Sequence, residues 1–369
     1  MEKPSTGEGN QKPIGEVIMN TSLPPFIDLH EDISLYYVSG GAGLKFTTAD
    51  FSYDMPGRDA DIPKYTKANV KIVLGSIAPL TYTLSSFRES VLTEGYKAKY
   101  RGIRTRSAQS QALQHFLTYY ELERKYTGNI EIVRSLDDIE KLWLGNKTGI
   151  LISMEGTESL EDIEDLYLFW ELGLRSLQLT WNFDNRYAAS CFSKKDYGLT
   201  GEGEQLIEIA NDLGIILDLA HSSEKSAKEA VGISSKPVII SHTNAKAVKD
   251  HVRNVSDEVI EAVSAKGGVI GFSCISPTIP GNSDLDGLIS HIMHVYDSFG
   301  PRVIGIGTDY FGLLDLEPTK GLENITKLPD LWNALLEHGM SEKDIDLITH
   351  ENALRVFRAN MNVKGLVQT

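Results

Sequence analysis

The sequence predicts an α/β fold in which eight parallel strands and the helices between them close into a TIM-type (β/α)8 barrel. Eight short apolar runs suited to buried strands recur along the chain, and helical patterns lie between them. The interval 82–147 is too long for one crossover and contains the helical stretch AQSQALQHFLTYYELERKY. We therefore expect a helical insertion before the third strand of the barrel.

The apolar runs are mostly continuous, which is typical of parallel strands that are covered on both faces. No internal repeat and no linker interrupts their succession, so we expect a single catalytic domain over residues 23–369. The runs are FIDLH (26–30), VKIVLGSI (70–77), TGILISM (148–154), LRSLQLTW (174–181), IILDLAH (215–221), PVIISH (237–242), GGVIGFSC (267–274) and VIGIGTD (303–309).

Several helical patterns have recognisable ends. Gly173 and Gly214 stop the patterns before the fourth and fifth runs, as glycines just past a helix do. Ser256 is the expected N-cap of the helix before the seventh run. Ser341 and Asp344 have spacing close to that of a capping box at the start of the closing helices.

Composition restricts the class of partner. The chain is 41% hydrophobic and 24% charged, with a net charge of −15 and an isoelectric point near 5.1. This acidity argues against nucleic acid or an anionic membrane as the main partner, although a local arginine or metal ion could still bind a small anion. The two cysteines, Cys191 and Cys274, lie in no paired motif, which excludes a disulfide framework and a thiolate zinc site.

The N-terminal stretch MEKPSTGEGNQKPIGEV is polar and lacks the apolar region of a secretory signal. We expect residues 1–22 to form a flexible tail. No apolar run reaches the length of a membrane span. The sequence thus favours a cytoplasmic protein without a membrane partner.

Residues capable of binding metal or moving protons stand where five of the apolar runs end. A barrel places its active site at the carboxyl ends of its strands, so these side chains should converge on one face. Each one alone could be structural, as a hydrogen-bonded histidine or a cap, but their joint placement predicts a metal site. The residues are His30, Asp32, Glu155, His221, His242 and Asp309.

The donor types indicate the metal and its chemistry. Nitrogen and oxygen donors without thiolate suit zinc, and manganese, iron or cobalt could also bind. Five ligands exceed what one catalytic zinc needs, so we expect two ions bridged by a water and by Glu155. Such a pair activates water for hydrolysis, and Asp309 is either a further ligand or the proton shuttle.

A possible substrate contact follows the sixth run. Arg253 precedes Asn254 and the Ser256 cap in the stretch SHTNAKAVKDHVRNVSDE. It is either a solvated loop charge or a guanidinium that binds a substrate carboxylate with two hydrogen bonds.

Five segments together resemble the membrane (renal) dipeptidase family of zinc peptidases, family M19, whose fold is a metallo-dependent hydrolase-like barrel. The resemblance covers roughly residues 24–358 and is weakest at 82–147. The segments are DLHEDI, LISMEG, GLTGEGEQLIEIANDLGIILDLAHSS, PVIISHTNAKAVKDHVRNVSDEVI and VIGIGTDYFG.

The resemblance implies a role for each candidate residue. His30, Asp32 and Glu155 would bind one zinc ion, and Glu155, His221 and His242 would bind the other. Asp309 would be the acid–base residue, and Arg253 would hold the C-terminal carboxylate of a dipeptide. The resemblance also suggests a homodimer.

One departure from the family pattern concerns substrate binding. Many members carry a histidine in a Leu-Thr-His sequence after the fourth strand, where it helps hold the reacting carbonyl. Here the text is LQLTWNFDN, so Trp181 takes that place. Trp181 is either a hydrogen-bond donor to the oxyanion, with Asn182 as another, or an apolar wall of the pocket.

Three functions follow from these observations. The leading hypothesis is a binuclear zinc dipeptidase that hydrolyses small dipeptides by means of a metal-bridging hydroxide. The second is a binuclear amidohydrolase or lactamase acting on another small amide or lactone. The third is a metal-binding barrel whose catalysis is weakened because Trp181 replaces the family histidine.

Overall fold

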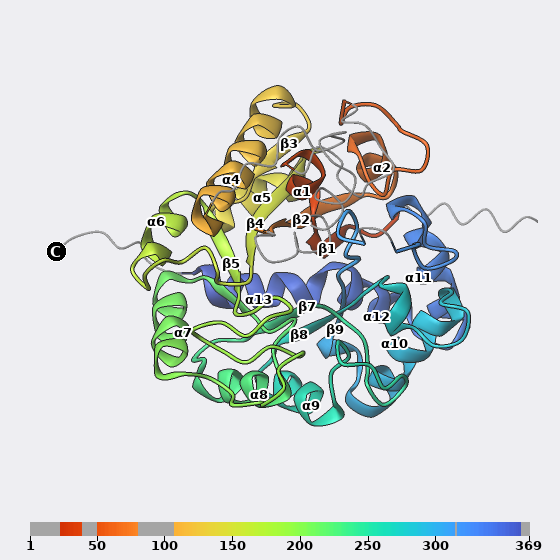
Figure 1. The fold of residues 1–369 in the computed structure, drawn as a ribbon. Coiled ribbons are helices and arrows are strands. Elements are labelled where there is room, and N and C mark those ends of the chain that lie inside the picture. The colour runs from red at the N-terminus through yellow and green to blue at the C-terminus, as the bar shows by residue number, and fades with distance from the viewer. Residues whose placement is uncertain (1–22, 39–49, 80–106, 314–315, 363–369) are drawn as a thin grey trace, which may run out of the picture.

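Eight parallel strands form a nearly closed barrel in the computed structural model, which describes residues 23–38, 50–79, 107–313 and 316–362 (Figure 1). The predicted tail, residues 1–22, lies outside this described part. The strands are, in spatial order, β1 (Phe26–Glu31), β2 (Val70–Ile77), β4 (Thr148–Glu155), β5 (Leu174–Gln178), β6 (Ile216–Asp218), β7 (Ile239–Thr243), β8 (Val269–Phe272) and β9 (Ile304–Ile306). All eight coincide with the predicted runs, so the predicted (β/α)8 barrel is confirmed.

Strands β9 and β1 approach each other at the mouth of the barrel. The backbone N–H of Asp309 donates to the carbonyl of His30 at 3.1 Å, and that of Asp32 donates to Tyr310 at 2.9 Å. A parallel bridge joins Glu31 to Tyr310. These contacts place the end of the first strand beside the segment that follows the last.

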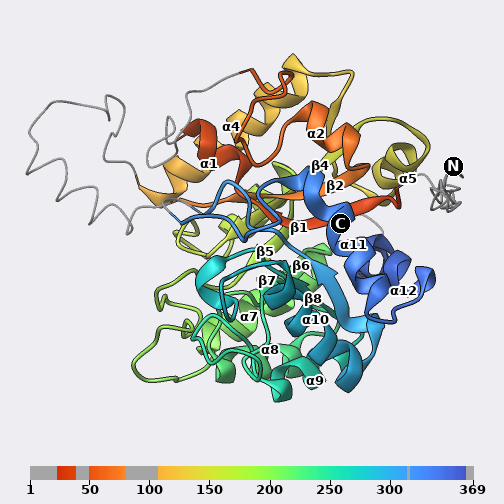
Figure 2. The same cartoon turned by 90° about the vertical axis from the view of Figure 1, so that its right-hand side faces the viewer.

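Helices surround the strands on all sides, as Figures 1 and 2 show together. Among the described residues, none of these helices combines the length and the apolar character needed to cross a membrane. They are α1 (Ile33–Val38), α2 (Ile62–Lys67), α4 (Ala108–Lys125), α5 (Leu136–Leu144), α6 (Asp165–Glu171), α7 (Gly201–Leu213), α8 (Glu224–Ile233), α9 (Asp257–Ala265), α10 (Leu285–Phe299), α11 (Leu328–Glu337), α12 (Glu342–Asp346) and α13 (Asn352–Met361).

The predicted helix ends agree with the structure. Ser256 caps α9 by accepting from the N–H of Val259, and Ser341 with Asp344 forms a complete capping box on α12. Gly214 ends α7 with a φ of 71°, a left-handed conformation that glycine adopts without a steric penalty.

The insertion before the third barrel strand contains α4, as predicted, and also helix α5 and a short strand that the sequence analysis missed. This strand, β3 (Ile130–Ile132), pairs with β4 outside the barrel path. It has three residues, too few for a recognisable apolar run, and tertiary pairing rather than local propensity makes it extended.

Two apolar clusters hold the barrel together. The larger one fills the space between the strands and the surrounding helices. The smaller one lies inside the barrel beside α13. It includes Ile72, Leu74 and Ile216 of the strands, together with Val356 and Phe357 of α13. Helix α13 crosses the end at which the strands begin, so the opposite end stays available for a polar site (Figure 1).

Candidate metal centre

The six predicted strand-end residues lie together at the carboxyl end of the barrel. Their side-chain donor atoms form three groups in which all ligand atoms lie within 4.8 Å of one another. Two of these groups share Glu155. The groups are His30, Asp32 and Glu155; Glu155, His221 and His242; and His30, His242 and Asp309.

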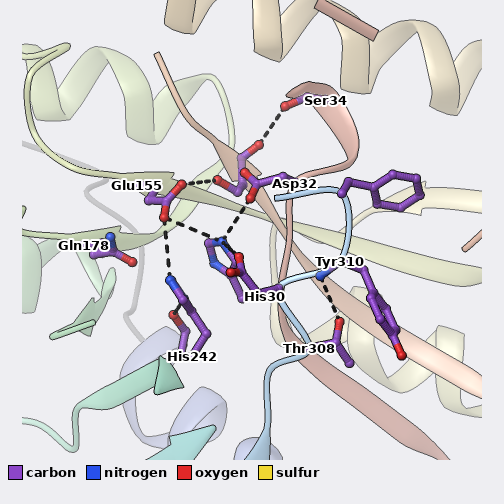
Figure 3. A network of polar contacts seen from close by, with 12 residues as sticks. His30, Asp32, Ser34, Glu155, Gln178, His242, Thr308 and Tyr310 are labelled. Atoms are coloured by element: carbon purple, nitrogen blue, oxygen red, sulfur yellow. Dashed lines mark hydrogen bonds and ion pairs between the residues drawn. The ribbon is translucent and has the colours of Figure 1, made fainter. Parts of the chain in front are cut away.

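His30 faces three carboxylates at the centre of the site (Figure 3). Its Nε2 lies 3.5 Å from Asp32 Oδ2, 3.8 Å from Glu155 Oε1 and 3.6 Å from Asp309 Oδ1. Among the described residues, neither ring nitrogen of His30 has a hydrogen-bond partner, and Asp32 Oδ1 is also buried without one. Buried polar atoms are rarely left unpaired, so these donors fit a bound cation.

The second group is built around one oxygen of Glu155. Glu155 Oε1 lies 3.3 Å from His221 Nε2 and 3.6 Å from His242 Nε2. The two Nε2 atoms are 2.9 Å apart. Because Glu155 Oε1 also faces His30, its carboxylate stands between the two ligand groups, as a bridging ligand would.

Hydrogen bonds behind the two histidines orient their rings. His221 Nδ1 lies 2.7 Å from Asn182 Oδ1, an oxygen that can only accept, so Nδ1 carries the proton and Nε2 presents a lone pair to the centre. Ser241 Oγ lies 2.8 Å from His242 Nδ1. Metal-binding histidines commonly have such a partner on their other nitrogen.

The pKa values of the buried carboxyl groups also favour bound cations. Burial, reinforced by the nearby Asp32 carboxylate, raises the pKa of Glu155 to about 8. Burial raises the pKa of Asp309 to about 7. Burial lowers the pKa of His30, but the carboxylates of Glu155, Asp32 and Asp309 outweigh this effect and raise it to about 10. Cations placed among these groups would compensate the buried negative charge.

The other two histidines are held neutral. Burial lowers the pKa of His221 and of His242 well below the ordinary value, and the charge of Arg253 lowers both further. Neutral imidazole is the form that binds metal. Nitrogen and oxygen donors of this kind fit divalent zinc, so the residues present suit the metal that the sequence predicts.

Backbone strain accompanies the site. His221 and Asp309 adopt left-handed φ angles of 62° and 63°, which non-glycine residues seldom do. Gly312 packs against the carboxylates of Asp32 and Asp309, and a Cβ at this position would collide with Asp32 Oδ2 and Asp309 Oδ1. The backbone is thus bent tightly around the carboxylates that the site requires.

Sequence reasoning missed Ser76 at the end of β2. Its Oγ donates to Glu155 Oε2 at 3.3 Å, the oxygen that faces away from His221 and His242. The Ser76 carbonyl accepts from Ser34 Oγ at 2.7 Å and from Tyr119 O–H at 2.6 Å. A serine at a strand end carries no distinctive signal, so only the tertiary contact could reveal it.

Asp28 and Glu31 flank the ligands of β1 without joining them. Asp28 accepts from the N–H of Thr308 at 2.9 Å and from its hydroxyl at 2.7 Å, which ties β1 to the segment after β9. Glu31 points away from the centre and accepts from Tyr65 O–H at 2.5 Å. Both residues thus support the strand that carries His30 and lie outside the three ligand groups.

The predicted substrate contacts surround this centre. Arg253 is 8% exposed, its Nη2 donates to the His242 carbonyl at 3.4 Å, and within the described part of the chain its guanidinium makes no ion pair. The Trp181 ring lies over the His221 ring, with centroids 6.0 Å apart. Asn182, predicted as a possible oxyanion donor, directs its oxygen at His221.

A family model of the membrane dipeptidases, peptidase family M19, matches residues 17–369. The chain belongs to this family. Dipeptidase tcpJ of Claviceps purpurea is 31% identical over 66% of this chain and 59% of that protein. An uncharacterized dipeptidase of Schizosaccharomyces pombe, C3A11.10c, is 37% identical over 56% of this chain and 52% of that protein. The chain therefore spans between half and two thirds of the length of these curated relatives.

Solved structures of metallopeptidases have the same fold. A metallopeptidase from Rhodobacter sphaeroides, bound to a phosphinate mimic of the dipeptide L-Ala-D-Ala, is 22% identical with a TM-score of 0.76, over 92% of this chain and 100% of that one. Dipeptidase AC, a metallopeptidase of family M19, matches with 22% identity and a TM-score of 0.76, over 92% and 99% of the two chains. At this level of identity the likeness supports the M19 barrel architecture.

Proposed function

We propose that this chain is a binuclear zinc dipeptidase that hydrolyses the peptide bond of small dipeptides. The observation that carries the proposal is the pair of buried donor groups that share Glu155 at the mouth of the barrel. Membership of the M19 family supports the same reaction class. His30, Asp32 and Glu155 would hold one ion, and Glu155, His221 and His242 the other.

Two divalent ions would lower the pKa of a water molecule toward neutrality and polarise the scissile carbonyl. Asp309 would take up the proton that the attacking water loses and deliver it to the leaving nitrogen. Its Oδ1 lies 3.6 Å from His30 Nε2, which places the carboxyl beside the first ligand group, and in the metal-free site burial raises its pKa to about 7.

Arg253 would bind the C-terminal carboxylate of the dipeptide. Its backbone is anchored because Thr243 Oγ1 donates to the Arg253 carbonyl at 2.7 Å. A buried guanidinium that makes no ion pair with the described residues is prepared to bind a carboxylate through two hydrogen bonds. This anchorage would fix the distance from the carboxylate to the scissile bond, which restricts the substrate to short peptides.

Metal analysis combined with a substrate panel tests the proposal. We expect two zinc ions per purified chain and hydrolysis of free dipeptides, with much slower turnover of dipeptide amides, which lack the carboxylate. Equal turnover of amides, lactams or lactones would favour the second function, an amidohydrolase. Two bound ions without turnover of any dipeptide would favour the third, a metal-binding barrel.

Domain organisation, assembly and location are part of the same proposal. Residues 23–369 would form one catalytic domain, which would dimerise with a second copy and act in the cytoplasm. Limited proteolysis, light scattering of the purified chain and cell fractionation test these three statements separately.

A further inference from the structure

Three rings form a row that leads from the metal centre towards the surface. The centroids of His221 and Trp181 are 6.0 Å apart with 30° between their planes, and those of Trp181 and Phe183 are 5.7 Å apart with 50°. Exposure increases along the row: His221 is 6% exposed, Trp181 is half-buried and Phe183 is 46% exposed. An aromatic surface thus continues directly from a proposed metal ligand.

The loop that carries the row is braced from within. Asn182, between the two aromatic residues, is fixed because its side-chain oxygen lies 2.7 Å from His221 Nδ1. Asn185 Nδ2 donates to the Leu179 carbonyl at 2.9 Å and to Thr157 Oγ1 at 3.0 Å. These bonds hold the loop on both sides of Trp181 and Phe183, so the rings are presented by a fixed backbone.

We propose that Trp181 and Phe183 form a binding wall that selects dipeptides carrying an aromatic or other large apolar side chain. This inference rests on the proposed dipeptidase function. An apolar side chain that packs on the exposed ring faces removes both surfaces from water, and aromatic pairs add a geometric preference. An acidic side chain would lose its hydration against the rings, whose negative faces would not compensate it.

Relative specificity constants test the wall. The comparison uses kcat/KM for Phe-Ala and Ala-Phe against Ala-Ala, measured on the metal-loaded protein. We expect at least one phenylalanine dipeptide to be preferred about tenfold, the size of effect that an apolar pocket typically gives. Trp181→Ala should remove most of this preference, read as the ratio of kcat/KM for the phenylalanine dipeptide to kcat/KM for Ala-Ala within that variant.

Three further variants make the comparison specific. Trp181→Phe keeps a ring but removes the indole N–H, and it should retain the preference. Phe183→Ala, at an exposed position, should reduce the preference by about threefold. The control is Tyr167→Ala on α6, where an exposed aromatic side chain of the outer helical layer is removed, and the preference should not change.

The outcomes separate this inference from the function on which it rests. A wild-type protein that hydrolyses no dipeptide refutes the proposed function. Turnover without a preference, or a preference unchanged in Trp181→Ala, overturns the wall alone. If Trp181→Ala abolishes turnover, calorimetric titration of that metal-loaded variant with Phe-Ala and Ala-Ala measures whether the variant still binds the phenylalanine dipeptide more tightly. Retained selectivity in binding overturns the wall, and equal weak binding supports it.

Discussion

At the scale of single residues, hydrogen bonds on the far side of the ligands orient the donor atoms. Asn182 fixes the proton on His221 Nδ1, and Ser241 contacts His242 Nδ1. Ser76 donates to the oxygen of Glu155 that faces away from these two histidines. Each contact removes rotational freedom from a ligand before any ion is present, and such outer contacts govern metal affinity.

We predict that Ser76→Ala weakens metal binding about tenfold, because Glu155 loses the hydrogen bond that orients its carboxylate. Competition with a chromophoric chelator measures the affinity directly and does not depend on activity. Ser176→Ala is the matched control, since Ser176 is equally buried on a barrel strand but its hydroxyl has no hydrogen-bond partner in the described part of the chain. Equal affinities in the two variants would contradict the role of Ser76.

We predict that Arg253→Ala lowers kcat/KM for dipeptides by about 10²-fold, because a buried charge-assisted pair with the substrate carboxylate is lost. The same substitution should leave the slow hydrolysis of dipeptide amides nearly unchanged. Arg253→Lys keeps the charge without the two-pronged geometry. Its kcat/KM for dipeptides should lie between the values for the wild type and for Arg253→Ala. The carboxylate clamp would be wrong if Arg253→Ala affected free dipeptides and amides alike.

At the scale of elements, the ends of strands and helices require particular backbone conformations. Gly214 ends α7 at a φ of 71°, and the next residues lead directly into β6. The pairing of β1 with β2 shifts register between Asp28 and Glu31, so regular alternation does not hold at the strand end that carries His30. Ligand positions there follow from the local bend and not only from the strand period.

We predict opposite effects for two glycine-to-alanine substitutions. Gly214→Ala should lower the free energy of unfolding by about 1 kcal/mol, because alanine is strained at positive φ. Gly232→Ala, inside α8 with no atom near the added Cβ, should raise it by about 0.5–1 kcal/mol. Urea unfolding measures both, and changes of the same sign would contradict the argument.

At the scale of the whole molecule, the barrel concentrates buried negative charge at one end. Asp32, Glu155 and Asp309 face His30 within 3.8 Å, while the apolar cluster with α13 occupies the other end. The chain already carries a net charge of −15. Cations at the mouth would therefore stabilise the folded state as well as the reaction.

We predict that the metal-free protein loses stability as the pH rises from 6 to 9. Burial raises the pKa of Glu155 to about 8 and of Asp309 to about 7, so the folded state binds protons that the unfolded state releases at lower pH. The Tm of chelator-treated protein should fall by about 5 °C over this range.

Scanning calorimetry of metal-free and metal-loaded samples at each pH checks this prediction. The loaded protein should change much less, because cations replace the protons as partners of the carboxylates. A Tm that varies with pH in the same way in both samples would show that these carboxyl groups are not responsible.

The sequence by itself determined the barrel and the residues that meet at its mouth. Eight apolar runs specify eight strands, and parallel strands in a barrel must bring their carboxyl ends together, so residues as distant as His30 and Asp309 were predictable neighbours. The Ser341 capping box was also predictable, because it depends only on two residues that lie three positions apart in the sequence. The roles of these residues in catalysis stay predictions.

Only the tertiary structure decided what supports the ligands. Strand β3 depends on pairing with β4, and Ser76 became part of the site through one contact with Glu155. The stacking of Trp181 on His221, and the row it forms with Phe183, likewise depend on how one loop folds over the barrel mouth. A pattern of apolar residues specifies elements and their order, whereas contacts between single side chains depend on distances that arise only when the chain is packed.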